Sequence, residues 1–247
     1  MKNKNNILMT SMMILILIIS ISGCADNESK DNPSAGTSDE DDTLNAESTG
    51  KTDVKTRLKN IFRNNYNLEY KATYVLKNTD FKDSTMSQYM RKDEIRTDMV
   101  VDGIESRSYV KGKKMYSCTK RVAEWTCMDL GIPYQTRGAE EASEKFVENM
   151  EAYNIKQLKK RTIVGTSTEC YSMETPIEGA YFEHCFSSDN IPLYTKAIIT
   201  NNSGTKITME MTATSYSTSV SDADFELPAE PTDIRDMIEL DNRWGSG

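Results

Sequence analysis

The sequence is poor in the residues from which catalytic sites are built. It has a single histidine, His184, and it contains no nucleophile elbow, phosphate-binding loop, paired-histidine metal motif or Cys-x-x-Cys pair. One imidazole without a placed carboxylate partner is weak evidence for a general base. We therefore expect a protein that is not an enzyme and that holds neither a metal ion nor a cofactor.

Basic residues are also scarce, since 30 lysines and arginines stand against 38 acidic residues and the formal net charge is −8. This balance excludes nucleic acid as a partner, because binding it requires a basic face. Between Ala25 and Gly50, acidic residues are frequent, Lys30 is the only basic residue and Leu44 the only large apolar one. Such a segment cannot bury enough surface to offset its chain entropy, which predicts a disordered, extended tether.

Only one long apolar run occurs near the start of the chain, from Ile7 to Ile21, and it is shorter than the roughly 20 residues of a spanning helix. Lysines precede the run and Ser22-Gly23-Cys24 ends it, which resembles the signal peptide and lipobox of prokaryotic lipoproteins. We expect cleavage before Cys24 and a lipid, such as palmitate, on its thiol. This lipid would anchor the protein to the cell membrane on the extracytoplasmic side. The alternatives are an ordinary signal peptide and a poor membrane helix with a chance cysteine.

Four further cysteines, Cys118, Cys127, Cys170 and Cys185, belong to a chain that we expect to be exported, where disulfides form and persist. Directly opposite residues of a hairpin with an even loop differ by an odd number, and separations of nine and fifteen both satisfy this rule. We therefore expect Cys118–Cys127 and Cys170–Cys185 disulfides, each across its own hairpin. A zinc site is the rival, but neither pair has the short spacing of zinc ligands.

Most of the remaining sequence alternates apolar and polar residues with a period of two, which is typical of half-buried strands. The expected strands are 67–76, 84–92, 94–101, 105–111, 113–119, 124–130, 160–166, 168–175, 179–187, 191–200 and 205–217. Helices are expected over 53–64, 139–153 and 233–240. About eleven strands with few helices predict an α+β, mainly antiparallel fold whose sheet closes, splits or curls around a cover. The expected segments are a signal peptide 1–23, an anchored tether 24–52, one domain 53–230 and a short helical tail 231–247.

The chain resembles the LolA/LolB-like superfamily of lipoprotein-sorting and lipid-carrying proteins. The resemblance rests on the order of these elements, on the Cys170-Tyr171 pair, and on the sequence segments from Asp189 to Tyr194 and from Val220 to Pro228. The resemblance covers residues 53 to 228. It implies an unclosed half-barrel whose concave face is covered by helices and whose hydrophobic cavity holds acyl chains. The disulfides and the long tether depart from the soluble carriers. They argue against a shuttling role, because a tethered protein cannot travel far from its membrane.

If Cys170 faces Cys185, the same register sets Tyr171 opposite His184 and Met173 opposite Phe182, on the face away from the disulfide. Phe186 shares that face. We predict a ligand cavity lined by these residues, namely Tyr171, Met173, Phe182, His184 and Phe186. His184 is either a satisfied core residue or a hydrogen-bonding partner for a lipid head group. Recurrent methionines are suited to adaptable apolar pockets, although they also fill cores.

These observations favour a membrane-anchored, extracytoplasmic protein that binds a lipid, an acyl chain or another apolar ligand in a half-barrel. The alternative is a protein-interaction or sensor module whose interior is filled by its own side chains. An enzyme would require a cleft with His184 beside a carboxylate.

Overall fold

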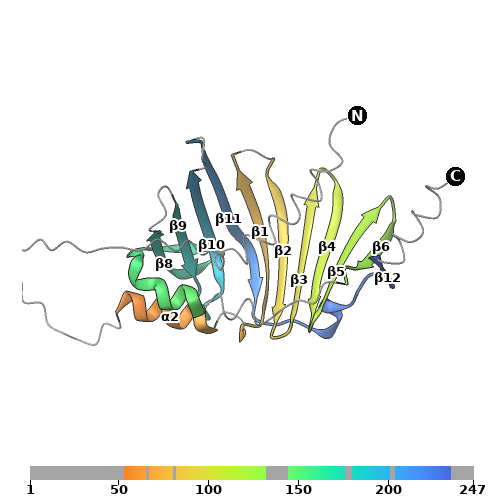
Figure 1. Cartoon of the computed structure of the whole chain (residues 1–247), viewed down its shortest axis with the longest axis horizontal. Coiled ribbons are helices and arrows are strands. Elements are labelled where there is room, and N and C mark those ends of the chain that lie inside the picture. Colours follow the sequence, from red (N-terminus) through yellow and green to blue (C-terminus); the bar gives the residue numbers. More distant parts are fainter. Residues whose placement is uncertain are drawn as a thin grey trace, which may run out of the picture.

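The structure, a computed structural model, describes residues 53–64, 67–79, 82–131, 144–175, 180–200 and 204–234. The strands in these ranges form one 12-stranded sheet with the order β12-β6-β5-β4-β3-β2-β1-β11-β10-β9-β8-β7. The sheet is not closed, because its two edge strands, β12 and β7, lie at opposite ends of this order (Figure 1). The predicted α+β, mainly antiparallel open fold is confirmed.

The chain builds the sheet as two antiparallel meanders that join where β1 pairs with β11. The first meander consists of β1 Tyr70–Asn78, β2 Ser84–Arg91, β3 Glu94–Val101, β4 Ile104–Lys111, β5 Lys114–Arg121 and β6 Glu124–Asp129. The second consists of β7 Asn154–Ile163, β8 Thr166–Glu174, β9 Tyr181–Phe186, β10 Pro192–Thr200 and β11 Lys206–Ser217. Tight turns such as Asp102-Gly103, both at positive φ, connect neighbouring strands as expected for hairpins that follow the sheet twist.

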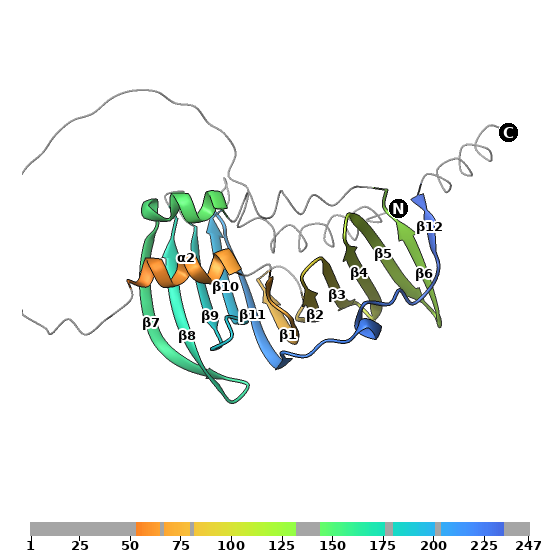
Figure 2. The ribbon, with the colours of Figure 1, turned by 90° about the horizontal axis from the view of Figure 1, so that it is seen from below.

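Helices cover one end of one face of the sheet. Helix α2, Val54–Asn64, begins after Asp53, whose carboxylate accepts a hydrogen bond from the Thr56 backbone N–H at 3.4 Å. An α-helical turn over 144–148 continues into the 3-10 helix η3, Asn149–Ala152. The sheet curves around the side on which these helices lie (Figure 2). We call this concave side the helix-side face and the other side the outer face.

Each hairpin disulfide joins residues that stand directly opposite each other on neighbouring strands. Cys118 of β5 pairs with Cys127 of β6, and Cys170 of β8 pairs with Cys185 of β9, each with a Cα–Cα distance of 4.0 Å. All four cysteines are fully buried. A cross-link over a loop of this size stabilises a fold by roughly 2 to 3 kcal/mol on the chain-entropy model, and it also fixes the hairpin register.

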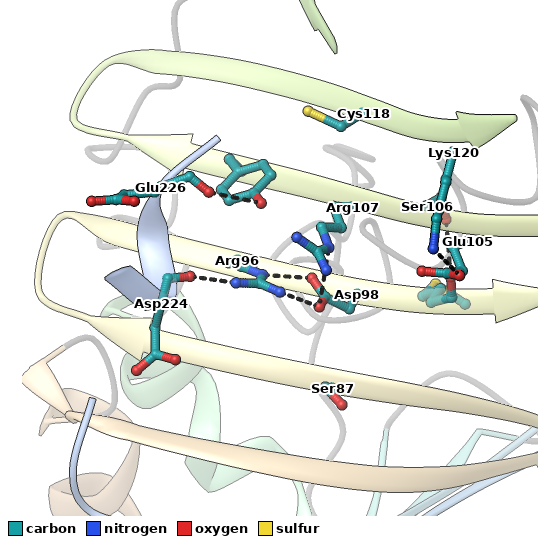
Figure 3. Close-up of polar contacts among 12 residues, drawn as sticks. Ser87, Arg96, Asp98, Glu105, Ser106, Arg107, Cys118, Lys120, Asp224 and Glu226 are labelled. Atoms are coloured by element: carbon teal, nitrogen blue, oxygen red, sulfur yellow. Dashed lines mark hydrogen bonds and ion pairs between the residues drawn. The ribbon is translucent and has the colours of Figure 1, made fainter. Parts of the chain in front are cut away.

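A C-terminal strap, residues 218–230, crosses the outer face and ends in β12, Pro231–Asp233. Its 3-10 helix η4, Asp222–Phe225, buries Phe225 almost completely. Arg96 donates a hydrogen bond to the carbonyl of Asp224 at 2.7 Å, and the Tyr109 hydroxyl donates one to the carbonyl of Glu226 at 3.2 Å (Figure 3). The strap therefore covers the outer face of the first meander, while the helices cover the helix-side face of the second.

The expected strand over 160–166 is wrong. Strand β7 starts at Asn154 and ends at Ile163, and Val164 and Gly165 form the turn to β8 with φ values of 51° and 72°. The alternation is obscured because the β7–β8 register shifts between Leu158 and Arg161. A valine at positive φ is also uncommon, so the sequence gives little indication of a turn at this position.

The expected helical tail changes too, because residues 231–233 form β12 and pair in parallel with β6. A three-residue strand has no alternation to detect, and Pro231 fits there only as the first residue of an edge strand. The expected helix 139–153 is helical from 144 to 152. Residues 139–143 and the expected helix beyond 234 lie outside the described residues.

We expect Phe225→Ala to lower the free energy of unfolding by about 3 to 5 kcal/mol, because it removes a buried ring and leaves a cavity under the strap. Urea unfolding of the exported, oxidised protein measures this loss. Glu226→Ala is the matched control, since its side chain is exposed and its carbonyl still accepts the Tyr109 bond. Similar losses in the two variants would contradict a packed strap.

Candidate lipid-binding face

Strand register separates the charged residues of the first meander almost completely onto the outer face. Arg96, Asp98 and Arg107 lie there, on the same side as Cys118, and the pairing of β2 to β6 extends this assignment across the meander. The full outer set is Lys71, Lys77, Arg91, Glu94, Arg96, Asp98, Glu105, Arg107, Lys111, Lys114, Lys120 and Asp129. On the helix-side face of β1 to β6, the only charged residues are Arg121 and Glu124, which oppose each other beside the last hairpin turn.

The outer-face charges are paired. Arg96 binds the Asp98 carboxylate with two hydrogen bonds of 2.7 and 2.5 Å, and Arg107 approaches the same carboxylate at 3.5 Å (Figure 3). The guanidinium of Arg107 also lies 4.4 Å from the centre of the Trp125 ring, so the open face of that ring is occupied. These contacts hold the outer face together.

Methionines show the opposite distribution. Every methionine on a described strand lies on the helix-side face: Met86, Met90, Met99, Met115, Met128, Met173, Met209 and Met211. Thioether side chains are flexible and polarizable and adapt to apolar surfaces of varied shape. The sequence shows that methionines recur, but only the strand register shows that they share one face.

An apolar stripe, formed by Met99, Met86, Tyr74, Ala213 and Leu193, crosses this face from β3 to β10. Met99, Met86, Tyr74 and Ala213 are successive cross-strand neighbours, and all members of the stripe belong to one buried cluster. The Tyr74 hydroxyl donates to the carbonyl of Pro192 at 3.0 Å, and burial raises the pKa of Tyr74 well above its usual value. The phenol is therefore a neutral, satisfied part of an apolar surface.

The five predicted cavity residues are brought together at the helix-covered end of the face. Tyr171 pairs with His184 and Met173 pairs with Phe182 across β8 and β9. Tyr171, Met173 and Phe186 are buried in one cluster with residues of α2 and of segment 144–152, against which Phe182 also packs. Their contacts are thus with the helices, and the cluster contains no residue of β1 to β6.

His184 is the polar group in this apolar cluster. Its ring stacks at 6.4 Å on Phe182 and at 5.9 Å on Phe186, measured between centroids, and Nδ1 lies 3.2 Å from the Thr195 hydroxyl. Nε2 is buried and has no hydrogen-bond partner among the described residues. Burial lowers the pKa of His184 to about 4, so the imidazole is neutral at physiological pH.

One ion pair borders the same cluster. Arg57 of α2 donates to the carboxylate of Glu169 at 3.1 Å, and the Tyr171 hydroxyl donates to that carboxylate at 3.2 Å. Burial, with Glu169 alongside, raises the pKa of Tyr171 to about 12. These contacts attach α2 to β8, and they account for Glu169 without a catalytic role.

Within the described ranges, no group of three or more His, Cys, Asp and Glu side chains is placed to hold a metal ion. In the same ranges, no helix is both long and apolar enough to cross a membrane.

No protein-family model and no curated protein sequence matches this chain. Among solved structures, it is similar to Pseudomonas aeruginosa MucB in complex with MucA (13% identity, TM-score 0.49, covering 70% of this chain and 60% of that chain). It is also similar to LprF from Mycobacterium bovis (12% identity, TM-score 0.42, covering 70% of this chain and 98% of that chain). A third similar structure is a putative outer-membrane lipoprotein-sorting protein domain from Vibrio parahaemolyticus (12% identity, TM-score 0.23, covering 70% of this chain and 94% of that chain).

The chain thus spans about 60% of the MucB chain that it matches. At such low identities the likeness concerns the fold alone and carries no statement about a ligand.

The buried imidazole predicts a pH dependence of stability. His184 has a lower pKa in the folded state than its ordinary value of 6.5, so the unfolded state binds more protons between about pH 6.5 and 4, and stability falls as pH falls through this window. We expect wild type to lose about 2 to 3 kcal/mol more than His184→Phe between pH 7 and pH 4.5. Urea unfolding of both proteins at both pH values measures this difference. The carboxylates are common to both proteins, so their contribution to the pH dependence cancels in the comparison. Parallel pH profiles would contradict a neutral buried His184.

Proposed function

We propose that this protein is a membrane-anchored, extracytoplasmic lipoprotein that binds a lipid, an acyl chain or another apolar ligand on its helix-side face. It acts by binding and not by catalysis. The apolar stripe of β3 to β10 receives the ligand, and the cluster around Tyr171 and Phe186 closes the far end of the stripe. Burial of acyl carbons drives binding, at roughly 0.8 kcal/mol per methylene.

The observation that carries the proposal is the separation of charge between the two faces. The outer face of β1 to β6 carries paired charged residues, as expected of a sheet face that meets water and the polar backbone of the strap. The helix-side face of the same strands instead carries methionines, tyrosines and small side chains. An adaptable surface on the concave side of an open sheet, with charges only at the Arg121–Glu124 hairpin end, favours an apolar ligand over a charged one.

The anchor follows from the Cys24 lipobox. Between Cys24 and Asp53 lie enough residues to span up to about 100 Å when extended, at 3.3 to 3.6 Å per residue. Acidic residues on this tether are repelled by anionic lipid. The domain can therefore reach ligands well above the membrane surface while remaining attached to it.

A negative charge on the helix-side face should abolish lipid binding. We expect Met90→Glu and Met115→Glu, two half-buried positions, to remove co-purifying lipid, because an unpaired carboxylate beside acyl carbons is strongly unfavourable. The measurement is native mass spectrometry of the exported, oxidised Cys24→Ser protein, followed by organic extraction and lipid analysis.

Thr85→Glu is the matched control, because Thr85 is exposed on the outer face of the same strand as Met90. It should retain lipid at the wild-type stoichiometry. A wild-type protein that is empty and refuses added lipid would overturn the carrier function and support the protein-interaction module instead.

The anchor has its own test. We expect Cys24→Ala to abolish incorporation of radiolabelled palmitate and to move the protein from the membrane fraction to a soluble fraction. The folded domain should keep its unfolding midpoint, because Cys24 lies outside it. Membrane association that persists in this variant would contradict a lipid anchor at Cys24.

A further inference from the structure

The helix-side face has a second region, the hydroxyl patch, which continues the apolar stripe from β3 toward β6. The patch consists of Thr97, Ser106, Ser108, Ser117, Thr119 and Thr126. Thr97, Ser108 and Ser117 are successive cross-strand neighbours. Met99 is the last residue of the apolar stripe, and its successive cross-strand neighbours on β4, β5 and β6 are Ser106, Thr119 and Thr126. Apolar and hydroxyl regions are therefore continuous across adjacent strands.

The patch is not patterned as an ordinary solvent-exposed sheet face. Its strands place their charges on the outer face, and Thr97 is buried while Ser108, Ser117 and Thr119 are half-buried. Among the described residues, these last three hydroxyls form no hydrogen bond with another side chain. They remain available both as donors and as acceptors.

The chemistry of the patch selects among head groups. Among the described strand residues of this face, a phosphate or carboxylate placed here would meet no cation apart from Arg121 beside the hairpin turn, which faces Glu124. Leaving such a charge unpaired on a partly desolvated surface is costly. A neutral head group with several hydroxyls can instead exchange hydrogen bonds with the serines and threonines without any desolvated charge.

We propose that the ligand of the helix-side face is an amphiphile with an uncharged, hydroxyl-bearing head group, which the hydroxyl patch binds while the apolar stripe binds the chain. This inference rests on the proposed lipid-binding function and names the ligand class. From β3 to β10 the stripe crosses four strand spacings, about 19 Å at 4.7 to 4.9 Å each. From β3 to β6 the patch crosses three, about 14 Å.

The test compares two amphiphiles with the same chain, dodecyl maltoside and dodecyl phosphate, each below its micelle concentration. Isothermal titration of the mature chain carrying Cys24→Ser gives both affinities, and we expect maltoside to bind at least tenfold more tightly. In a triple variant, Ser108→Ala with Ser117→Ala and Thr119→Val, maltoside affinity should fall about tenfold or more while phosphate affinity stays unchanged. Thr85→Val on the outer face is the control and should change neither affinity.

The outcomes separate this inference from the function on which it rests. Equal affinities for the two amphiphiles in wild type, or a triple variant that binds maltoside as wild type does, would overturn the head-group assignment and leave apolar binding in place. Failure of wild type to bind either amphiphile would overturn both. The wild-type comparison requires no substitution in the face, so a folding defect in the triple variant cannot mask the result.

Discussion

Cross-strand register is the constraint on which the rest of this structure depends. A shift of one residue would turn every strand over and bring Arg96, Asp98 and Arg107 onto the helix-side face. Two disulfides across hairpins prevent this slip, one in each meander. They stabilise the fold, but their more important effect is to keep charged and apolar side chains on separate faces. The surface that we propose for ligand binding exists only in this register.

Both faces of the sheet need a cover, and the chain supplies a different one to each. On the outer face of the first meander, the strap buries Phe225 and accepts hydrogen bonds from Arg96 and Tyr109 through backbone carbonyls. On the helix-side face of the second meander, α2 and segment 144–152 pack on Tyr171 and its neighbours. The described helices thus cover only part of the concave side, and the methionine-rich part of the first meander lies beyond their buried cluster.

Much of this arrangement is predictable from sequence because it is local. Period-two alternation predicts most strands, and the odd separation of each cysteine pair fits residues that face each other across a hairpin. Sequence cannot predict which face is concave, because alternation distinguishes two faces without orienting them. It also misses β12, whose parallel pairing with β6 joins residues about a hundred positions apart, and β7, whose bulge interrupts the alternation. The buried state of His184 is likewise a product of the helices that pack over it.

The predicted cavity residues and the proposed binding surface divide the helix-side face between two physical roles. Around Tyr171 and Phe186 the face is already matched to α2 by aromatic contacts and by the Arg57–Glu169 pair, so a ligand there would have to replace those contacts. Along Tyr74, Met86 and Met99 the partners within the described chain are other strand residues of the same cluster. Tyr74 and Met86 are themselves buried, so a ligand that reaches the stripe also replaces existing contacts, but it does not have to displace α2, which contributes no residue to this cluster. Binding should therefore begin on the apolar stripe and reach the helix-covered cluster only if α2 moves.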